Sequence, residues 1–181
     1  MLLETPKAEN GTTAEPFTLS DPKGASYSMS ELQGKNGLLI AFICNHCPYV
    51  KAIASRLVED AKRLQEAGIN VVAINANDYN QVPQDSPANM LLFAEKHSFN
   101  FPYLVDEDQS VSKAYGAVCT PDFFGFNSAG ELQYRGRLDS AAMGDATNRE
   151  PELMDAMLAM ATTGLGPATQ HPSIGCSIKW K

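Results

Sequence analysis

The feature that most constrains this chain is a pair of cysteines at the junction of a predicted strand and a predicted helix. The apolar run 38–43 leads directly into Cys44, and Cys47 follows it immediately before Pro48. A continuous apolar run is typical of a strand that is buried on both faces. A helix N-terminus stabilises a thiolate and places the two sulfurs one turn apart, so the motif can form a reversible disulfide.

The segments around the cysteines predict alternating strands and helices. Residues 47–67 carry apolar side chains at three- and four-residue spacing, which predicts an amphipathic helix that ends at Gly68. The apolar run 69–74 predicts a second buried strand and a right-handed parallel unit. The other predicted elements are helices at 88–97, 110–115 and 150–163, a strand at 101–105, and a hairpin of 122–126 with 131–137. This order predicts an α/β protein with the dithiol at the carboxyl end of a strand, where ligands gather.

Length and composition favour a single domain without a nucleic-acid or membrane surface. The 181 residues suffice for one core, with residues 1–14 as a loose leader and residues 164–181 as a C-terminal tail. A net charge of −7 without a basic cluster disfavours nucleic acid and anionic membranes. We see neither a transmembrane run nor a signal sequence and expect a cytoplasmic protein, whose four cysteines indicate redox or metal chemistry. We expect no bound cofactor.

A second motif points to a specific fold family. Thr120-Pro121 precedes the predicted hairpin, where thioredoxin-like proteins carry a cis-proline, and a Cys-x-x-Cys beside a strand–helix–strand pattern is their other signature. Residues 15–163 resemble the thioredoxin fold, and the segment 17–32 is similar to the opening hairpin of its redoxin, or AhpC/TSA-like, branch. The resemblance implies a three-layer α/β/α domain with a mixed sheet and an N-terminal β-hairpin extension. The motifs at 44–48, 119–124 and 175–181 look like those of one group of bacterial thioredoxin-family proteins.

This resemblance implies a thiol-disulfide oxidoreductase. The Cys44 thiolate would attack a substrate disulfide and Cys47 would resolve the mixed disulfide, while Thr120 and cis-Pro121 would pair with the bound substrate. The substrate would be a disulfide-bearing protein or a small thiol or peroxide, and a thioredoxin- or glutathione-type partner would complete the cycle. His46 lies between the cysteines, and its ring either stabilises the thiolate or is solvated with little effect.

Three further residues are candidate auxiliaries. Cys119 precedes the expected cis-proline by two residues and is either near the dithiol or a small buried hydrophobe. Cys176 lies in the tail, and we hypothesise that the tail returns to the active-site face and gives this cysteine a relay role. The polar loop 75–87 is long enough to be functional, and Asn77 is its candidate residue.

The chain departs from the active-site patterns of both thioredoxins and peroxiredoxins, which limits the predicted mechanism. Leu38 occupies the position of thioredoxin's buried aspartate, so no proton acceptor is assigned. The peroxiredoxin pattern P-x-x-x-T-x-x-C is matched from neither cysteine. The residues at its Pro and Thr positions are Gly37 and Ala41 when counted from Cys44, and Ile40 and Cys44 when counted from Cys47. A standard peroxiredoxin site is therefore not encoded.

Three alternatives stay open. A thiol-dependent peroxidase would use Cys44 on a peroxide. A copper- or zinc-binding redoxin-fold protein would use Cys44, His46 and Cys47, with Cys119 or Cys176 as the fourth ligand. The two-residue Cys spacing favours redox use, and we assign no metal. A redox-silent interaction module is the alternative that the dithiol disfavours most.

Overall fold

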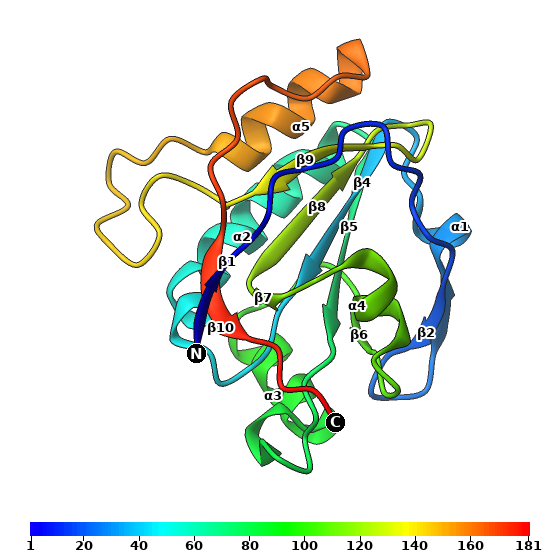
Figure 1. Ribbon diagram of the computed structural model, residues 1–181, viewed down its shortest axis with the longest axis vertical. Coiled ribbons are helices and arrows are strands. Elements are labelled where there is room, and N and C mark those ends of the chain that lie inside the picture. Colours follow the sequence, from blue (N-terminus) through cyan, green and yellow to red (C-terminus); the bar gives the residue numbers. More distant parts are fainter.

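Strand β4 (Gly37–Phe42), formed by the apolar run before the cysteines, lies inside a seven-stranded mixed sheet (Figure 1). The computed structural model describes residues 1–181, and the strand order of this sheet is β3-β2-β6-β5-β4-β8-β9. Strand β4 pairs parallel with β5 (Ile69–Asn75) and antiparallel with β8 (Asp122–Phe126). The second strand of the predicted strand–helix–strand unit and the first strand of the predicted hairpin therefore flank the strand that leads to the dithiol.

The remaining elements follow the predicted order closely. The other strands are β1 (Leu2–Glu4), β2 (Thr18–Ser20), β3 (Ser26–Ser28), β6 (Tyr103–Val105), β7 (Cys119–Thr120), β9 (Leu132–Gly136) and β10 (Ile174–Ser177). The helices are α1 (Met29–Leu32), α2 (Pro48–Glu66), the 3-10 turn η1 (Pro83–Asp85), α3 (Pro87–Lys96), α4 (Ser110–Tyr115) and α5 (Glu152–Thr163). No helix has both the length and the apolar character required to cross a membrane.

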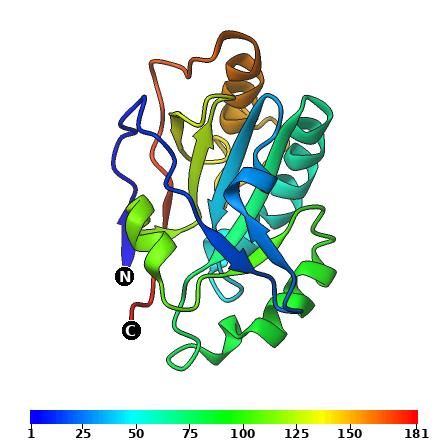
Figure 2. The same cartoon turned by 90° about the vertical axis from the view of Figure 1, so that its right-hand side faces the viewer.

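The side chains of β4 alternate between two cores, one on each face of the sheet. Leu39 and Ala41 belong to the core under α2, α3 and α5, whereas Leu38 and Ile40 belong to the core under α1 and α4. Figure 2 shows α2 and α5 on one side of the sheet and α4 on the other. This alternation explains why the strand reads as a continuous apolar run.

The two chain ends are more ordered than the sequence predicts. Strand β1 pairs antiparallel with β10, and β10 pairs antiparallel with β7, which makes a second, three-stranded sheet. The prediction of a loose leader is wrong for Leu2–Glu4. The segment Leu2–Glu4 makes its backbone hydrogen bonds with a strand at the opposite end of the chain. The local amino-acid composition does not reveal this pairing. The tail does return to the cysteines, as the hypothesis for Cys176 requires.

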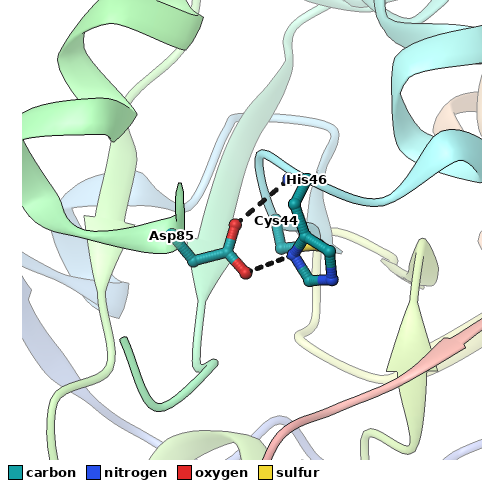
Figure 3. Close-up of side chains that lie close together, drawn as sticks. All are labelled: Cys44, His46 and Asp85. Atoms are coloured by element: carbon teal, nitrogen blue, oxygen red, sulfur yellow. Dashed lines mark hydrogen bonds and ion pairs between the residues drawn. The ribbon is translucent and has the colours of Figure 1, made fainter. Parts of the chain in front are cut away.

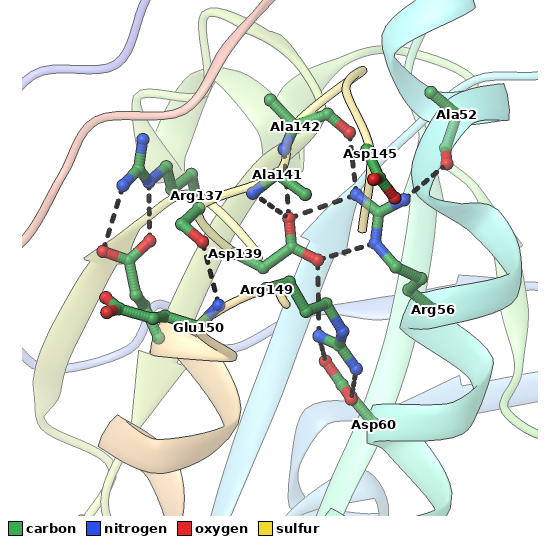
Figure 4. Close-up of polar contacts among 12 residues, drawn as sticks. Ala52, Arg56, Asp60, Arg137, Asp139, Ala141, Ala142, Asp145, Arg149 and Glu150 are labelled. Carbon is green, nitrogen blue, oxygen red and sulfur yellow. Dashed lines mark hydrogen bonds and ion pairs between the residues drawn. The ribbon is translucent and has the colours of Figure 1, made fainter. Parts of the chain in front are cut away.

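A network of arginines and aspartates holds the long connection between β9 and α5 against α2 (Figure 4). Arg56 Nε donates to Asp139 Oδ2 at 2.7 Å, and Arg149 Nη2 donates to Asp60 Oδ1 at 2.6 Å. Arg149 Nη1 also donates to Asp139 Oδ2 at 3.3 Å, which joins the two pairs. The network fixes the connection where it passes beside the middle of α2.

A second ion pair holds the loop that contains the predicted cis-proline. Arg135 donates to Asp122 through Nη2 at 2.9 Å and through Nε at 3.2 Å, and its guanidinium lies 4.4 Å from the Phe124 ring centroid. Asp122 Oδ2 also accepts the Val118 N–H at 3.1 Å. Burial raises the pKa of Asp122, and Arg135 offsets this effect. The pair therefore ties β9 to the segment before the cis-proline.

Removing this arginine is expected to destabilise the protein strongly. In Arg135→Met, the fully buried Asp122 carboxylate loses its counter-charge, and we expect a loss of about 3–5 kcal/mol in the free energy of unfolding. Urea denaturation measures it. Adding Asp122→Asn should restore part of the loss. A loss for Arg135→Met below about 1 kcal/mol, the range of a surface pair, would contradict this role.

Candidate active site

The two cysteines lie at the start of α2 and are fully enclosed. Cys44 follows β4, and Cys47 is the N-cap residue of α2 with Pro48 in the first turn. Each has 0% of its surface exposed. Proline suits the first turn of a helix because its missing N–H would be unpaired there. The predicted strand–dithiol–helix junction is thus confirmed, with both sulfurs shielded from solvent.

The cis-proline loop packs against both sulfurs. The Thr120–Pro121 peptide bond is cis, as predicted. Thr120 Oγ1 lies 3.2 Å from Cys44 Sγ, and the Thr120 carbonyl oxygen accepts a hydrogen bond from Cys47 Sγ at 3.3 Å. One residue of this loop therefore contacts the two thiols through separate oxygen atoms.

Asp85 organises the other side of the dithiol, and the sequence did not single it out. Its carboxylate is fully buried. Oδ1 accepts the backbone N–H groups of Asn45 at 2.7 Å and His46 at 3.2 Å. Oδ2 lies 2.5 Å from His46 Nδ1 and accepts from Asn77 Nδ2 at 2.9 Å. Figure 3 shows the carboxylate facing the His46 ring beside Cys44. The sequence feature that could have indicated Asp85 is the long polar loop 75–87, near whose end it lies.

His46 and Asn77 take part through Asp85 rather than through the sulfurs. The His46 side chain is 26% exposed and pairs with the carboxylate, so it is not simply solvated. Asn77 donates to the same carboxylate, while its Oδ1 accepts the Lys179 N–H at 2.9 Å. Asn77 thus connects the Asp85 loop to the C-terminal tail, and its auxiliary role stays a prediction.

The two active-site thiols differ in the groups that surround them. The hydrogen bond with Cys47 first, then burial and the Asp85 carboxylate, holds the pKa of Cys44 well above its usual range. The Cys44 thiol, followed by the thiol and N–H of Cys176 and by the N–H of Val50, holds the pKa of Cys47 below its usual range against the opposing effect of burial. The Cys44 thiolate expected from the sequence stays a prediction. These directions favour charge on Cys47, at the helix N-terminus, over charge on Cys44.

The remaining two cysteines differ in their surroundings. Cys119 is fully buried with its thiol 3.7 Å from the Pro121 carbonyl oxygen, and burial raises its pKa to about 12. It therefore resembles a small buried hydrophobe more than a reactive thiol. Cys176 lies on β10, is partly exposed, and packs against the core that contains Cys47. Of the two, Cys176 is the one whose thiol interacts with the dithiol.

Two of the residues that the sequence offered as possible metal ligands, Cys44 and His46, lie close to a third possible ligand, Asp85. The donor atoms of Cys44, His46 and Asp85 lie within 4.8 Å of one another, whereas Cys47 points to the Thr120 carbonyl. Two ligand atoms of tetrahedral zinc, each roughly 2.0 Å from the ion, are roughly 3.3 Å apart. His46 Nδ1 and Asp85 Oδ2 are 2.5 Å apart. In this arrangement the two atoms bind each other instead of sharing an ion.

An apolar cavity of about 140 Å³ lies beside the cis-proline. It is bounded by the start of α2, the cis-proline loop, the β9–α5 connection and β10. The residues that line it include Tyr49, Ile53, Pro121, Phe123, Leu138 and Ile174. The cavity could hold a small molecule next to the active-site loop.

Comparisons with known proteins agree with this geometry. A family model described as the AhpC/TSA family matches residues 10–135, more than half of the chain. The chain is 28% identical to the thiol-disulfide oxidoreductase ResA of Halalkalibacterium halodurans, over 69% of this chain and 66% of that protein. It is 29% identical to peroxiredoxin Bcp of Escherichia coli, over 64% of this chain and 69% of that protein. The match to ResA thus spans slightly less than two thirds of that relative.

Solved structures extend the similarity to the whole chain. An uncharacterized conserved protein from Geobacillus kaustophilus is 41% identical, with a TM-score of 0.93 over 100% of this chain and 97% of that one. A hypothetical protein from Sinorhizobium meliloti is 37% identical, with a TM-score of 0.91 over 98% of each chain. A secreted disulfide oxidoreductase of Mycobacterium tuberculosis, 22% identical, has a TM-score of 0.61 over 79% of this chain and 94% of that one. The chain therefore has a thioredoxin-like fold and belongs to the AhpC/TSA family.

Proposed function

We propose that this protein is a thiol-disulfide oxidoreductase whose reactive pair is Cys44 and Cys47. The observation that carries the proposal is the contact of both sulfurs with Thr120, directly before cis-Pro121, with Cys47 at the N-terminus of α2. A thiolate at a helix N-terminus with a second thiol beside it has the two groups that disulfide exchange requires.

The lower pKa of Cys47 relative to Cys44 favours the following order of steps. The Cys47 thiolate attacks one sulfur of a substrate disulfide, so the substrate S–S bond breaks and a mixed disulfide forms. Cys44 then loses its proton and attacks Cys47 Sγ, which releases the second substrate sulfur as a thiolate and leaves a Cys44–Cys47 disulfide. The substrate gains two electrons and the dithiol loses two. An external thiol of the thioredoxin or glutathione type then reduces the Cys44–Cys47 disulfide back to the dithiol.

The second step needs an acceptor for the Cys44 proton. The Asp85–His46 pair is a suitable acceptor, because its donor atoms lie within 4.8 Å of Cys44 Sγ and His46 reaches solvent. The same carboxylate fixes the backbone between the cysteines through the N–H groups of Asn45 and His46. Asp85 therefore holds the loop in place and accepts the proton.

A thiol peroxidase is the second candidate, and the enclosure of the sulfurs favours it. Neither cysteine has exposed surface, and the cavity of about 140 Å³ beside Pro121, whose lining includes neither cysteine, suits a small molecule better than a peptide strand. The Cys47 thiolate would attack a peroxide oxygen and become a sulfenic acid as water or an alcohol leaves. Cys44 would then condense with the sulfenic acid, releasing water and forming the same disulfide.

Two assays separate these candidates. With dithiothreitol as reductant, we expect the wild type to accelerate insulin-disulfide reduction at least about tenfold over dithiothreitol alone, because exchange through a stabilised thiolate is faster. The Cys44→Ser, Cys47→Ser double variant is the control. Peroxide consumption measured with the same reductant tests the peroxidase. If the wild type equals the double variant in both assays, the proposed function is wrong. Activity on peroxide alone would establish the second candidate in its place.

A further inference from the structure

Strand β10 lies between β1 and β7 in the three-stranded sheet, so it covers the edge of β7 beside the cis-proline. It pairs antiparallel with β7, and Cys176 lies opposite Thr120, the residue that contacts both active-site sulfurs. Adding a strand to an open edge is a common way for a protein to bind an extended peptide. The chain's own tail is therefore bound as such a peptide would be, with a cysteine at the register position closest to the dithiol.

The fit of this strand to the loop is close on both sides of Cys176. A Cβ on Gly175 would lie 1.9 Å from the Thr120 carbonyl oxygen, so only glycine permits the approach. Ser173 Oγ donates to the Pro121 carbonyl oxygen at 2.7 Å. Beyond the strand, the Lys179 N–H donates to Asn77 Oδ1 at 2.9 Å. The tail is thus anchored both to the cis-proline loop and to the Asp85 loop.

We infer that β10 is an internal substrate strand of the dithiol, and that Cys176 is the cysteine that exchanges with Cys47. This inference rests on the proposed function and names the internal partner of the same site. It also addresses a difficulty of that site: Cys44 and Cys47 are fully enclosed, whereas Cys176 is partly exposed. A disulfide carried to Cys176 can be reached by an external thiol.

The exchange balances without any further oxidant. In the oxidised protein, the Cys176 thiolate attacks Cys47 Sγ of the Cys44–Cys47 disulfide. The Cys47–Cys176 bond forms, the Cys44–Cys47 bond breaks, and Cys44 leaves as a thiolate that takes up a proton. The number of disulfides is unchanged. An external thiolate then attacks Cys176 Sγ, so Cys47 leaves as a thiolate and a mixed disulfide forms on Cys176. A second external thiolate attacks the external sulfur of that mixed disulfide, which frees Cys176 and releases the external disulfide.

The charges around Cys176 link its reactivity to the state of Cys47. Burial first, then the interaction with Cys47, raises the pKa of Cys176 to about 11, while Lys179 and the N-terminal amino group act in the opposite direction. Once Cys47 is part of a disulfide, its negative charge is gone and only burial still opposes the Cys176 thiolate. The pKa of Cys176 is therefore raised in the reduced protein, and the loss of the Cys47 charge on oxidation removes part of that rise.

Disulfide mapping of Cys44→Ser tests the inference directly. The variant is oxidised with a stoichiometric amount of diamide, free thiols are trapped with maleimide, and peptides are identified by mass. We expect a Cys47–Cys176 disulfide in most molecules. Cys44→Ser with Cys119→Ser, the matched control, should give the same product. Cys44→Ser with Cys176→Ser should give no intramolecular disulfide. Maleimide-labelled Cys176 in most molecules of a folded Cys44→Ser protein would overturn the inference.

A second measurement uses an intact dithiol. Cys176→Ser should still form the Cys44–Cys47 disulfide, but we expect its reduction by glutathione to slow at least about tenfold, because the remaining disulfide is enclosed. Cys119→Ser should match the wild type. If Cys176→Ser is reduced as fast as the wild type, the inference fails while the proposed function stands. If the wild type forms no Cys44–Cys47 disulfide and turns over no substrate, the proposed function itself has failed.

Discussion

Cys47→Ser is expected to remove the reactive thiolate and to lower the rate of the first exchange step at least about a hundredfold, as the loss of a nucleophile does. The reason is the set of neighbours of each sulfur: the Cys44 thiol and Cys176 lower the pKa of Cys47, whereas the hydrogen bond with Cys47, burial and Asp85 raise the pKa of Cys44. Ultraviolet absorbance of the thiolate against pH, together with single-turnover reaction with a disulfide, measures both effects.

Cys44→Ser is the matched control, because it removes the other sulfur of the same loop. The Cys44 thiol is the strongest stabiliser of the Cys47 thiolate, so its loss should move the pKa of Cys47 up toward the usual range. The first attack should continue, and the mixed disulfide at Cys47 should accumulate because its resolving thiol is gone. If Cys47→Ser accumulated the mixed disulfide and Cys44→Ser lost the first step, the order of the cysteines would be the reverse.

The same neighbours of Cys47 predict the pH dependence of the first step. A free thiol, with a pKa near 8.5, loses about tenfold in thiolate for each unit of pH below that value. Because the folded protein lowers the pKa of Cys47, its thiolate should persist as the pH falls from about 8.5, and the rate should decline only near the lower, folded pKa. A tenfold loss per unit beginning near pH 8.5 would contradict a stabilised thiolate.

Asp85→Ala is expected to disrupt the active site and destabilise the fold together. It leaves the N–H groups of Asn45 and His46 and the amide of Asn77 without their acceptor inside the protein. Orphaned buried donors cost about 1–3 kcal/mol each, so we expect a total loss of at least about 3 kcal/mol in the free energy of unfolding. Denaturant unfolding measures this loss.

Asp85→Asn separates support of the loop from proton transfer. The amide oxygen can still accept the N–H groups of Asn45 and His46, but the side chain no longer carries a charge. We expect a smaller loss of stability, about 1–3 kcal/mol, a first exchange step that is retained, and a mixed disulfide that resolves more slowly. Quenched-flow trapping of the mixed disulfide measures that step.

Asp106→Asn provides the control for this experiment. Asp106 is also buried, but it accepts hydrogen bonds from Val111 and Ser112 at the start of α4. The Asp106→Asn substitution should lower the free energy of unfolding without changing the rates of the exchange steps. If Asp85→Asn resolved the mixed disulfide at the wild-type rate, Asp85 would have a purely structural role.

Much of the framework could be predicted because it depends on local sequence. The run before Cys44 is apolar at every position since both faces of β4 are covered, and the spacing of apolar residues along α2 follows the helical repeat. Ser86 caps α3 through its hydroxyl, and Gly68, with a φ of +79°, follows the end of α2. Each of these signals lies within a few residues of the structure that it specifies.

The acidity of the cysteines could not be read in the same way. The position at the start of a helix predicts that one cysteine of the dithiol is a thiolate. Which of the two carries the charge depends on groups that are distant in sequence. Asp85 raises the pKa of Cys44 from a loop about forty residues away, and the thiol and N–H of Cys176 stabilise the Cys47 thiolate from the far end of the chain. Electrostatic effects follow distance in space, which the order of residues does not give.

By itself, then, the sequence determined a dithiol between a buried strand and a helix, with a Thr-Pro loop to meet it, because periodicity and turn residues specify local structure. The tertiary structure decided which groups surround each sulfur, which carboxylate supports the loop, and what lies against the cis-proline. The last of these is the chain's own C-terminal strand, held by backbone hydrogen bonds between segments more than fifty residues apart. Such pairings have no local signature, since any segment with an extended backbone offers the same donors and acceptors.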